Sequence, residues 1–324
     1  MEYIPLEKPI MELELRIDEL RRLATTQAIN LDKEIGDLNQ KAEVLREQIF
    51  NSLTPYEAVQ LARHPRRPTT LDIIGSMCSN FMELHGDRNF FDDKAIVGGI
   101  ATLGAYPIII IGHQKGKGTK DCIYRNFAMP KPEGYRKALR LMSLAERFNL
   151  HIITLVNTPG AYPGIDAEER GQSEAIAKNI MVMSRLKVPI IVVIVGEGGS
   201  GGALALGVGN RVHMLKTAFY SVISPEGCAS ILMKDASKAS DAAIAMKITA
   251  QDALSLKLID SIIEEPKGGA HRSVDLTSQF IKKQIIKDLM ELKQLPPETL
   301  KEERIKKYLA MGEVVEKKPS PQTH

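Results

Sequence analysis

The chain has 324 residues, enough for one large or two modest domains with a hydrophobic core. Apolar residues make up 44% and charged residues 26%, which is typical of globular proteins and excludes a wholly disordered or membrane-embedded chain. The formal net charge of +3 is too small to indicate nucleic acid or an anionic membrane as the main partner.

Apolar side chains recur at helical spacing from Leu13 to Ile49, and the polar segment 25–30 interrupts their phase. This pattern predicts two helices joined by a bend. The helical hairpin either packs on its own domain or forms an arm that grips another subunit. Next, Thr54, Pro55 and Glu57 form the start signal of a helix that continues through Leu61.

From Leu71 onward, short strands alternate with helices, which predicts an α/β domain with parallel strands buried on both faces. The first two strands form a hairpin across a glycine-containing turn. Residues 275–311 return to helix, divided at Pro296 and Pro297. The expected strands are 96–103, 106–112, 151–157, 189–195 and 212–222, and the expected helices are 135–148, 168–186, 203–208 and 225–232.

Two glycine-rich turns each join a strand to a helix, as VNTPGAYPG (156–164) and VGEGGSGGA (195–203). The first amides of a helix have no intrahelical acceptor, and residues without a Cβ allow a ligand oxygen to approach closely. The two turns therefore predict two anion or oxyanion pockets in which backbone donors stabilise negative charge that develops during a reaction.

Two other motifs overlap the second turn. The spacing G-x-G-x-x-G at 196–201 is that of a dinucleotide fingerprint, although the following helix is short and no acidic residue ends the next strand. The spacing G-x-S-x-G at 198–202 would make Ser200 the nucleophile of a serine hydrolase. No downstream histidine is clearly placed as its base; the candidates are His213, His271 and His324.

Residues 112–140 carry a local excess of six positive charges, which is twice the net charge of the chain. Either these side chains cover a solvated surface, or they bind coenzyme phosphates or an acidic partner protein. The basic residues are Lys115, Lys117, Lys120, Arg125, Lys131, Arg136, Lys137 and Arg140.

The three cysteines are far apart and form no C-x-x-C pair, so we expect neither a disulfide framework nor a metal site in this chain. The N-terminal segment has no basic region followed by a long apolar run, and no apolar run is long enough to span a bilayer. A cytoplasmic location is therefore expected.

The chain resembles the carboxyltransferase α subunit of bacterial acetyl-CoA carboxylase in several long sequence segments. The resemblance extends over nearly the whole chain apart from its C-terminal tail. It rests on segments such as LARHPRRPTTLD (61–72), GHQKGK (112–117), NFAMPKPEGYRKALRLM (126–142), NTPGAYPGIDAEERGQSEAIA (157–177), GEGGSGGALALGVGN (196–210) and YSVISPEGCASILMKDA (220–236).

The resemblance implies a crotonase-like (ClpP/crotonase) fold of repeated β-β-α units, with an N-terminal helical hairpin and C-terminal helices. It also implies a β-subunit partner that carries a zinc ribbon, in an α2β2 assembly, together with a biotin carboxyl carrier protein and an ATP-consuming biotin carboxylase. The reaction would move a carboxyl group from carboxybiotin, held on the carrier, to acetyl-CoA, giving malonyl-CoA for fatty acid synthesis. The remaining alternatives are a crotonase-type acyl-CoA hydrolase or isomerase and the Ser200 hydrolase.

Carried onto this sequence, the resemblance assigns the carboxybiotin side of a shared active site to the two glycine turns. The ureido oxygen of biotin would accept from backbone amides, and the biotin enolate would deprotonate acetyl-CoA without a protein base. The donating amides would be those of Gly198, Gly199, Gly160 and Ala161. The wall of the carboxybiotin pocket would be formed by Tyr162, Pro163, Gly164 and Gly201. Coenzyme A phosphates or the carrier protein would contact Lys115, Lys117, Lys120 and Arg125.

The sequence also predicts a division of the chain into four parts. Residues 1–60 would form the helical interaction arm and residues 61–270 the carboxyltransferase domain. Residues 271–312 would form C-terminal helices, and residues 313–324 a disordered tail.

Overall fold

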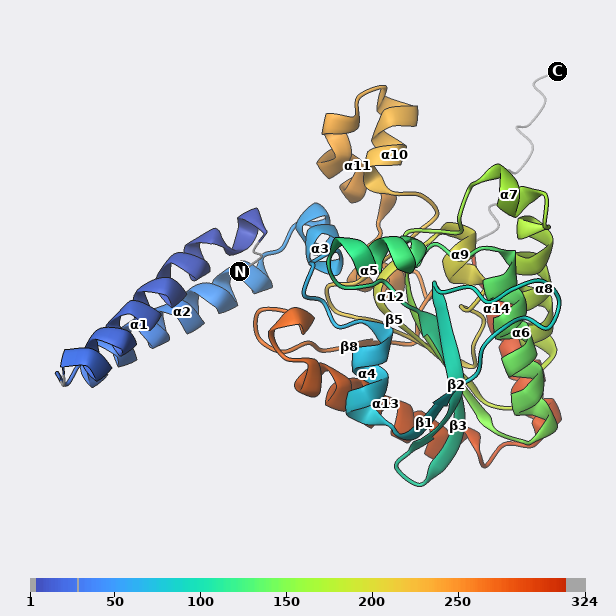
Figure 1. The fold of residues 1–324 in the computed structure, drawn as a ribbon. Helices are drawn as coiled ribbons and strands as arrows, with labels where there is room; N and C mark the ends of the chain where they lie inside the picture. Colours follow the sequence, from blue (N-terminus) through green and yellow to red (C-terminus); the bar gives the residue numbers. More distant parts are fainter. Residues whose placement is uncertain (1–3, 28, 313–324) are drawn as a thin grey trace, which may run out of the picture.

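The computed structural model of the protein describes residues 4–27 and 29–312 (Figure 1). The predicted disordered tail, 313–324, lies outside the described residues. At the centre is an eight-stranded mixed sheet in the order β1-β2-β3-β4-β5-β6-β8, with β7 paired to the end of β5. The strands are β1 Ser79–Glu83, β2 Ile96–Leu103, β3 Tyr106–His113, β4 His151–Thr158, β5 Ile190–Gly199, β6 Arg211–Leu215, β7 Phe219–Ser221 and β8 Ser261–Ile263.

The predicted hairpin is confirmed, because β2 and β3 pair antiparallel from Ile96 opposite His113 to Leu103 opposite Tyr106. From β3 onward, the neighbours β4, β5, β6 and β8 are parallel. The carboxyl ends of β3, β4 and β5 therefore meet at one edge of the sheet, where open α/β sheets bind their ligands.

Helices cover both faces of the sheet. In Figure 1, α6, α8 and α14 lie on one side, and α4 and α13 on the other. Strands β4 and β5 are buried along almost their whole length between these layers, which explains their run of Ile and Val. The helices here are α4 Thr70–Met77, α6 Pro132–Arg147, α8 Gln172–Arg185, α13 Val274–Leu292 and α14 Pro297–Leu309.

The N-terminal segment forms the two predicted helices, α1 Lys8–Gln27 and α2 Asp32–Asn51. They pack against each other as a hairpin that extends away from the sheet (Figure 1). Helix α3, Pro55–Ala62, begins at the predicted capping box, in which the Thr54 side chain accepts from the Glu57 amide. The domain boundary expected after residue 60 falls within this helix.

Five predicted elements differ from the structure. Strand β5 runs on to Gly199, so Gly196, Gly198 and Gly199 belong to the strand rather than to a turn, and the helix expected at 203–208 is α9, Ser200–Leu204. The helix expected at 168–186 is broken at Gly171, whose φ of +79° interrupts helical geometry, into α7 Ile165–Glu168 and α8. The strand expected at 212–222 divides into β6 and β7.

The fifth differing element is the helix expected at 225–232. Helix α10, Pro225–Cys228, continues as a π-helical turn, Ala229–Met233. Together with α11, Ala239–Met246, it forms the helical projection drawn in orange in Figure 1. Two short helices, α5 Gly118–Tyr124 and α12 Ala250–Ser255, were not predicted from the sequence.

Candidate active site

The two glycine-rich segments lie in direct contact at the carboxyl edge of β4 and β5. A Cβ on Gly202 would lie 2.7 Å from the Ala161 nitrogen, and a Cβ on Gly199 would lie 2.2 Å from the Pro159 carbonyl oxygen. Both glycines are buried and allow this close approach of two backbones. The two predicted pockets are therefore parts of one site.

The four amides chosen from the sequence differ in availability. The Gly160 amide donates to Thr158 Oγ1 at 3.1 Å, and Gly198 and Gly199 pair in the sheet with Tyr220 and Ser221 of β7. Within the described residues, the Ala161 amide has no acceptor.

The first turn of α9 contributes further donors. Its initial residues, Ser200, Gly201 and Gly202, precede the point at which intrahelical hydrogen bonds begin, and their amides have no acceptor among the described residues. Because Gly202 touches Ala161, these donors lie beside the Ala161 amide. Such a group of fixed backbone donors can stabilise an oxyanion, and it includes Gly202, which the sequence did not single out.

The predicted pocket wall is built on the first turn. The Tyr162 amide donates to the Pro130 carbonyl at 3.0 Å, and its ring covers Gly164, where a Cβ would lie 2.2 Å from the ring. Pro163 is exposed and Gly201 is half-buried; a Cβ on Gly201 would point towards Ile176 at 3.7 Å.

A strained segment supports the same turn. Three consecutive residues, Asn126, Phe127 and Ala128, have φ values of +47°, +54° and +61°. Left-handed backbone is costly for residues other than glycine and persists only where the surroundings hold it. Here Thr158 Oγ1 donates to the Ala128 carbonyl at 2.5 Å, which fixes the segment to the end of β4. The sequence carries no local signal for this conformation.

A cavity of about 310 Å³ lies at this edge of the sheet. It is lined mainly by the end of α3 and the segment before α4 (62–69), and by the β3–α5 loop and α5, with Phe127 and Asn157 completing the wall. Asn157 is the one lining residue that belongs to a glycine segment. Phe127 is 46% exposed although it is a large apolar residue. The cavity is of the size that small-molecule sites use.

Ion pairs around the buried carboxylate of Glu197 connect the cavity to the second glycine segment. Glu197, at the end of β5, accepts from Lys115 and from Arg63 Nε, the latter at 2.8 Å, and Arg63 also binds Glu226 of α10 at 2.8 Å. Burial alone would raise the pKa of Glu197, but the charges of Lys115 and Arg63 outweigh burial and lower it. Glu197 therefore stays ionised and fixes two cations at the cavity.

The basic segment is largely neutralised by acidic residues from elsewhere in the chain. Lys117 pairs with Asp72 at 2.7 Å, whereas Arg125 pairs with Asp121 of the same segment at 3.6 Å and Lys120 is exposed. The remaining pairs are Lys131 with Asp166, Arg136 with Asp87 and Lys137 with Asp92. The local excess of positive charge seen in the sequence is therefore much smaller in space.

Ser200 has the exposed, left-handed geometry of a nucleophile elbow, with φ of +52°. The histidines considered as its base are engaged elsewhere: His213 binds Asp288 at 2.5 Å, and His271 binds Glu7 at 2.8 Å. His324 lies outside the described residues. The dinucleotide alternative is also weakened, because α9 has only five residues.

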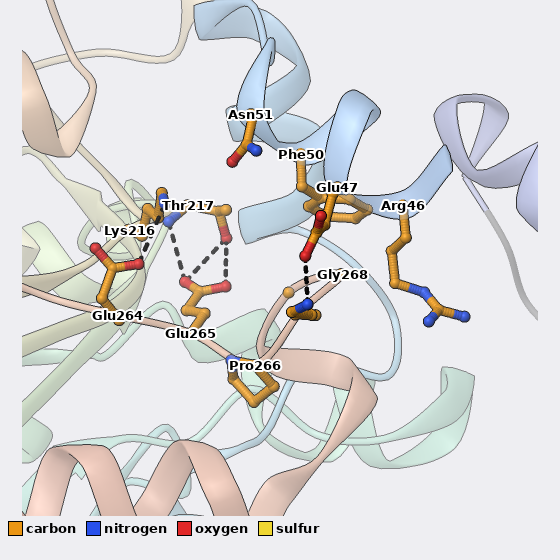
Figure 2. Close-up of a pocket in the computed structure, with 12 residues that line it drawn as sticks. Arg46, Glu47, Phe50, Asn51, Lys216, Thr217, Glu264, Glu265, Pro266 and Gly268 are labelled. Atoms are coloured by element: carbon orange, nitrogen blue, oxygen red, sulfur yellow. Dashed lines mark hydrogen bonds and ion pairs between the residues drawn. The ribbon is translucent and has the colours of Figure 1, made fainter. Parts of the chain in front are cut away.

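A second cleft, of about 300 Å³, lies where α2 meets the loop after β8 (Figure 2). Its rim is closed by ion pairs between Lys216 and Glu264 at 3.2 Å and between Lys267 and Glu47. Thr217 and Glu265 in its wall are hydrogen-bonded to each other. None of its lining residues belongs to the glycine turns.

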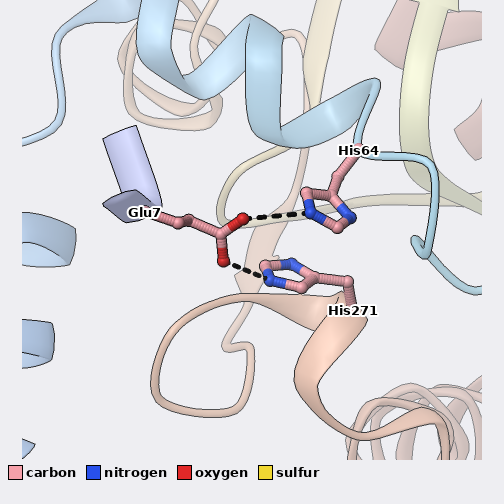
Figure 3. Close-up of side chains that lie close together, drawn as sticks. All are labelled: Glu7, His64 and His271. Atoms are coloured by element: carbon pink, nitrogen blue, oxygen red, sulfur yellow. Dashed lines mark hydrogen bonds and ion pairs between the residues drawn. The ribbon is translucent and has the colours of Figure 1, made fainter. Parts of the chain in front are cut away.

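Glu7, His64 and His271 form a buried cluster of possible metal ligands (Figure 3). Each carboxylate oxygen of Glu7 faces the Nε2 of one imidazole, at 3.0 Å for His64 and 2.8 Å for His271. The Arg66 amide donates to His64 Nδ1, so a neutral His64 carries its proton on Nε2 and has no lone pair there for a metal. The cluster fits a hydrogen-bonded latch between the N-terminal segment and the body better than it fits a metal site.

Comparison with solved structures gives the class of fold. The chain superposes on a chain of transcarboxylase 12S with a TM-score of 0.57 at 16% identity, covering 79% of this chain and 44% of that one. It matches the β subunit of Pseudomonas aeruginosa geranyl-CoA carboxylase with a TM-score of 0.54 at 16% identity, over 76% and 46% of the two chains. The chain thus spans less than half the length of these relatives. It has the crotonase-like carboxyltransferase fold, as expected.

The sequence places the chain more narrowly. Residues 3–312 match the family described as acetyl co-enzyme A carboxylase carboxyltransferase-like. The chain is 55% identical to the acetyl-coenzyme A carboxylase carboxyl transferase subunit alpha of Coxiella burnetii, covering 96% of this chain and 99% of that protein. The subunit alpha of Xanthomonas campestris is 54% identical, over 96% and 97%. The chain belongs to this family of carboxyltransferase α subunits, and the resemblance seen in the sequence is confirmed.

Family membership makes the protein one part of a biotin-dependent acetyl-CoA carboxylase that includes a β subunit. No helix among the described residues is both long and apolar enough to cross a membrane.

Proposed function

We propose that this chain supplies the carboxybiotin half of an active site that it shares with a β subunit. Together they transfer the carboxyl group from carboxybiotin on the carrier protein to acetyl-CoA, giving malonyl-CoA, in an α2β2 assembly in the cytoplasm. The observation that carries the proposal is the contact between the two glycine segments, which gathers unpartnered amides of Ala161 and the α9 first turn in one place. A cavity of about 310 Å³ meets the first of these segments at Asn157.

Carboxybiotin supplies the carboxyl group, and its loss leaves negative charge on the ureido oxygen. The amides of Ala161 and of the first turn of α9 would donate to that oxygen, with Gly198, Gly199 and Gly160 holding the backbone in place. Fixed donors need no reorganisation as charge develops, and removing one such donor costs roughly 100-fold to 1000-fold in rate. Tyr162, packed over Gly164, would wall the pocket.

The cations near the site have different proposed tasks. Lys115 is held by Glu197 at the cavity, and we assign it to substrate charge inside the site. Lys117, Lys120 and Arg125 lie on or close to α5, and we assign them to coenzyme A phosphates or to the carrier. Since Lys117 and Arg125 have acidic partners, exposed Lys120 is the strongest candidate of the three.

The purified chain is expected to form no malonyl-CoA from acetyl-CoA and a free carboxybiotin derivative, because half of the site is missing. Addition of the β subunit should restore turnover. The measurement is carboxyl transfer by the chain, by β and by the reconstituted pair. Full activity of the isolated chain, or an inactive pair that has assembled, would contradict the shared site.

A further inference from the structure

His113, the last residue of β3, is completely buried beside both glycine segments and has no role in the chemistry described above. The Asn157 amide faces His113 Nδ1 at 3.4 Å, so Nδ1 is the acceptor and the neutral ring carries its proton on Nε2. Nε2 is buried and has no hydrogen-bond partner among the described residues. Burial lowers the pKa of His113 to about 3, although the Gly202 and Leu155 backbones favour the charged ring.

Asn157 extends this contact to the second glycine segment. Its Oδ1 accepts from the Glu197 amide at 3.0 Å, and it lies so close to Gly196 that a Cβ there would be 2.4 Å away. One side of the His113 ring thus faces the strand that leads into the first turn. The ring also faces the backbone of Gly202, which belongs to the second glycine segment. Gly202 in turn touches Ala161 of the first segment.

We propose that His113 is a positioning residue, which sets the separation of the two glycine segments so that the Ala161 amide and the first turn of α9 face the same space. A neutral imidazole suits this place, because it accepts from Asn157 at one nitrogen and fills the space beside Gly202 without burying a charge. The inference rests on the proposed function, since it concerns the donors of that site.

Its test uses the reconstituted complex and two substitutions. His113→Ala removes the ring and should lower kcat by roughly 100-fold with less than about a threefold change in KM for acetyl-CoA, because small displacements of a reacting group act on kcat. His113→Asn places an amide oxygen near the position of Nδ1, keeps an acceptor for Asn157, and should recover at least tenfold of the loss. Both variants should still bind the β subunit.

A matched control lies at the opposite edge of the sheet. His151 begins β4, is half-buried, and its pKa is also lowered by burial and by Lys293, but it lies far from the glycine segments along the strand. His151→Asn should leave kcat within about twofold. If His113→Ala fails to fold, His113→Asn compared with His151→Asn still decides the question.

The inference is overturned if His113→Ala keeps its kcat, if only KM changes, or if His113→Asn folds and assembles but is as inactive as the alanine variant. That last result would indicate proton transfer by the imidazole. Failure of the proposed function would look different, because the unsubstituted complex itself would then not transfer carboxyl groups.

Discussion

At the scale of single residues, the site depends on glycines that face other backbone atoms. A Cβ on Gly202 would lie 2.7 Å from both Ala161 nitrogen and the Gly160 carbonyl carbon. Backbone cannot give way as the end of a flexible side chain can. Gly199 is equally constrained, since the Pro159 carbonyl lies 2.2 Å from its Cβ position, so Gly199→Val would separate the segments as well as block a ligand.

Gly202→Ala is therefore expected to push the two segments apart by several tenths of an ångström and to lower kcat of the complex by at least 100-fold, as loss of an oxyanion donor does. Gly75→Ala is the matched control, because its Cβ would meet no atom within 4 Å. Carboxyl transfer and binding to β are the measurements for both variants.

Normal activity of Gly202→Ala would contradict the role given to the contact between the segments.

Ser200→Ala tests the alternative of a serine hydrolase in the same assay. Because Ser200 would contribute only its amide, the alanine variant should keep most of the rate, and complete loss with folding intact would favour a serine nucleophile.

At the scale of elements, the latch of Glu7, His64 and His271 fixes the base of the N-terminal hairpin to the body (Figure 3). Burial opposes the charge of Glu7, but hydrogen bonds from His271 and His64 outweigh burial and lower its pKa well below the usual range. Burial lowers the pKa of His271, although Glu7 partly offsets this. Arg272 supplies a further donor to Glu7 at 3.2 Å.

Both shifts predict that stability falls as the pH falls. A lowered imidazole pKa means that the unfolded chain binds the proton more readily, so stability is lost from about pH 6.5 downward; the lowered Glu7 pKa removes more below about pH 4.5. Denaturant midpoints at pH 7.5, 6.0 and 5.0 should decrease in that order.

His271→Gln should flatten the decrease between pH 7.5 and 5.0, because it replaces the imidazole whose pKa is lowered by burial with a neutral amide. His85→Gln is the control, since the His85 side chain is 57% exposed. Equal slopes for His271→Gln and the unsubstituted chain would show that the latch does not carry this pH dependence.

At the scale of the whole molecule, the active-site edge also carries exposed apolar side chains. The projection of α10, its π-helical turn and α11 is tied to that edge by Glu226, which binds Arg63, and it exposes Ile231 and Leu232 at 67% and 76%. Apolar residues gathered near a site commonly mark an interface. Since the family has a β subunit, we expect β to cover this projection.

Leu232→Asp should weaken binding to β at least tenfold, because it places a charge in an apolar contact, and should leave the thermal stability of the isolated chain unchanged. Leu309→Asp is the control: Leu309 is 81% exposed on α14, next to Tyr308, whose hydroxyl accepts from the Gly209 amide beside Ile190, at the other end of β5. Affinity can be measured by titration of β. Equal affinities for the two variants would place the interface elsewhere.

The sequence by itself determined the helical hairpin, the β2–β3 hairpin and the buried strands β4 and β5, because period and composition are local properties. Long segments that match the family's sequence pattern also identified the family. Only the tertiary structure decided that the two glycine segments form one site, that Ala161 and α9 hold the unpartnered amides, and that Glu197 and His113 lie behind them. It also showed that acids distant in sequence neutralise the basic segment. These features are contacts between residues far apart in the chain, and no local pattern encodes which backbone groups a neighbouring strand will satisfy.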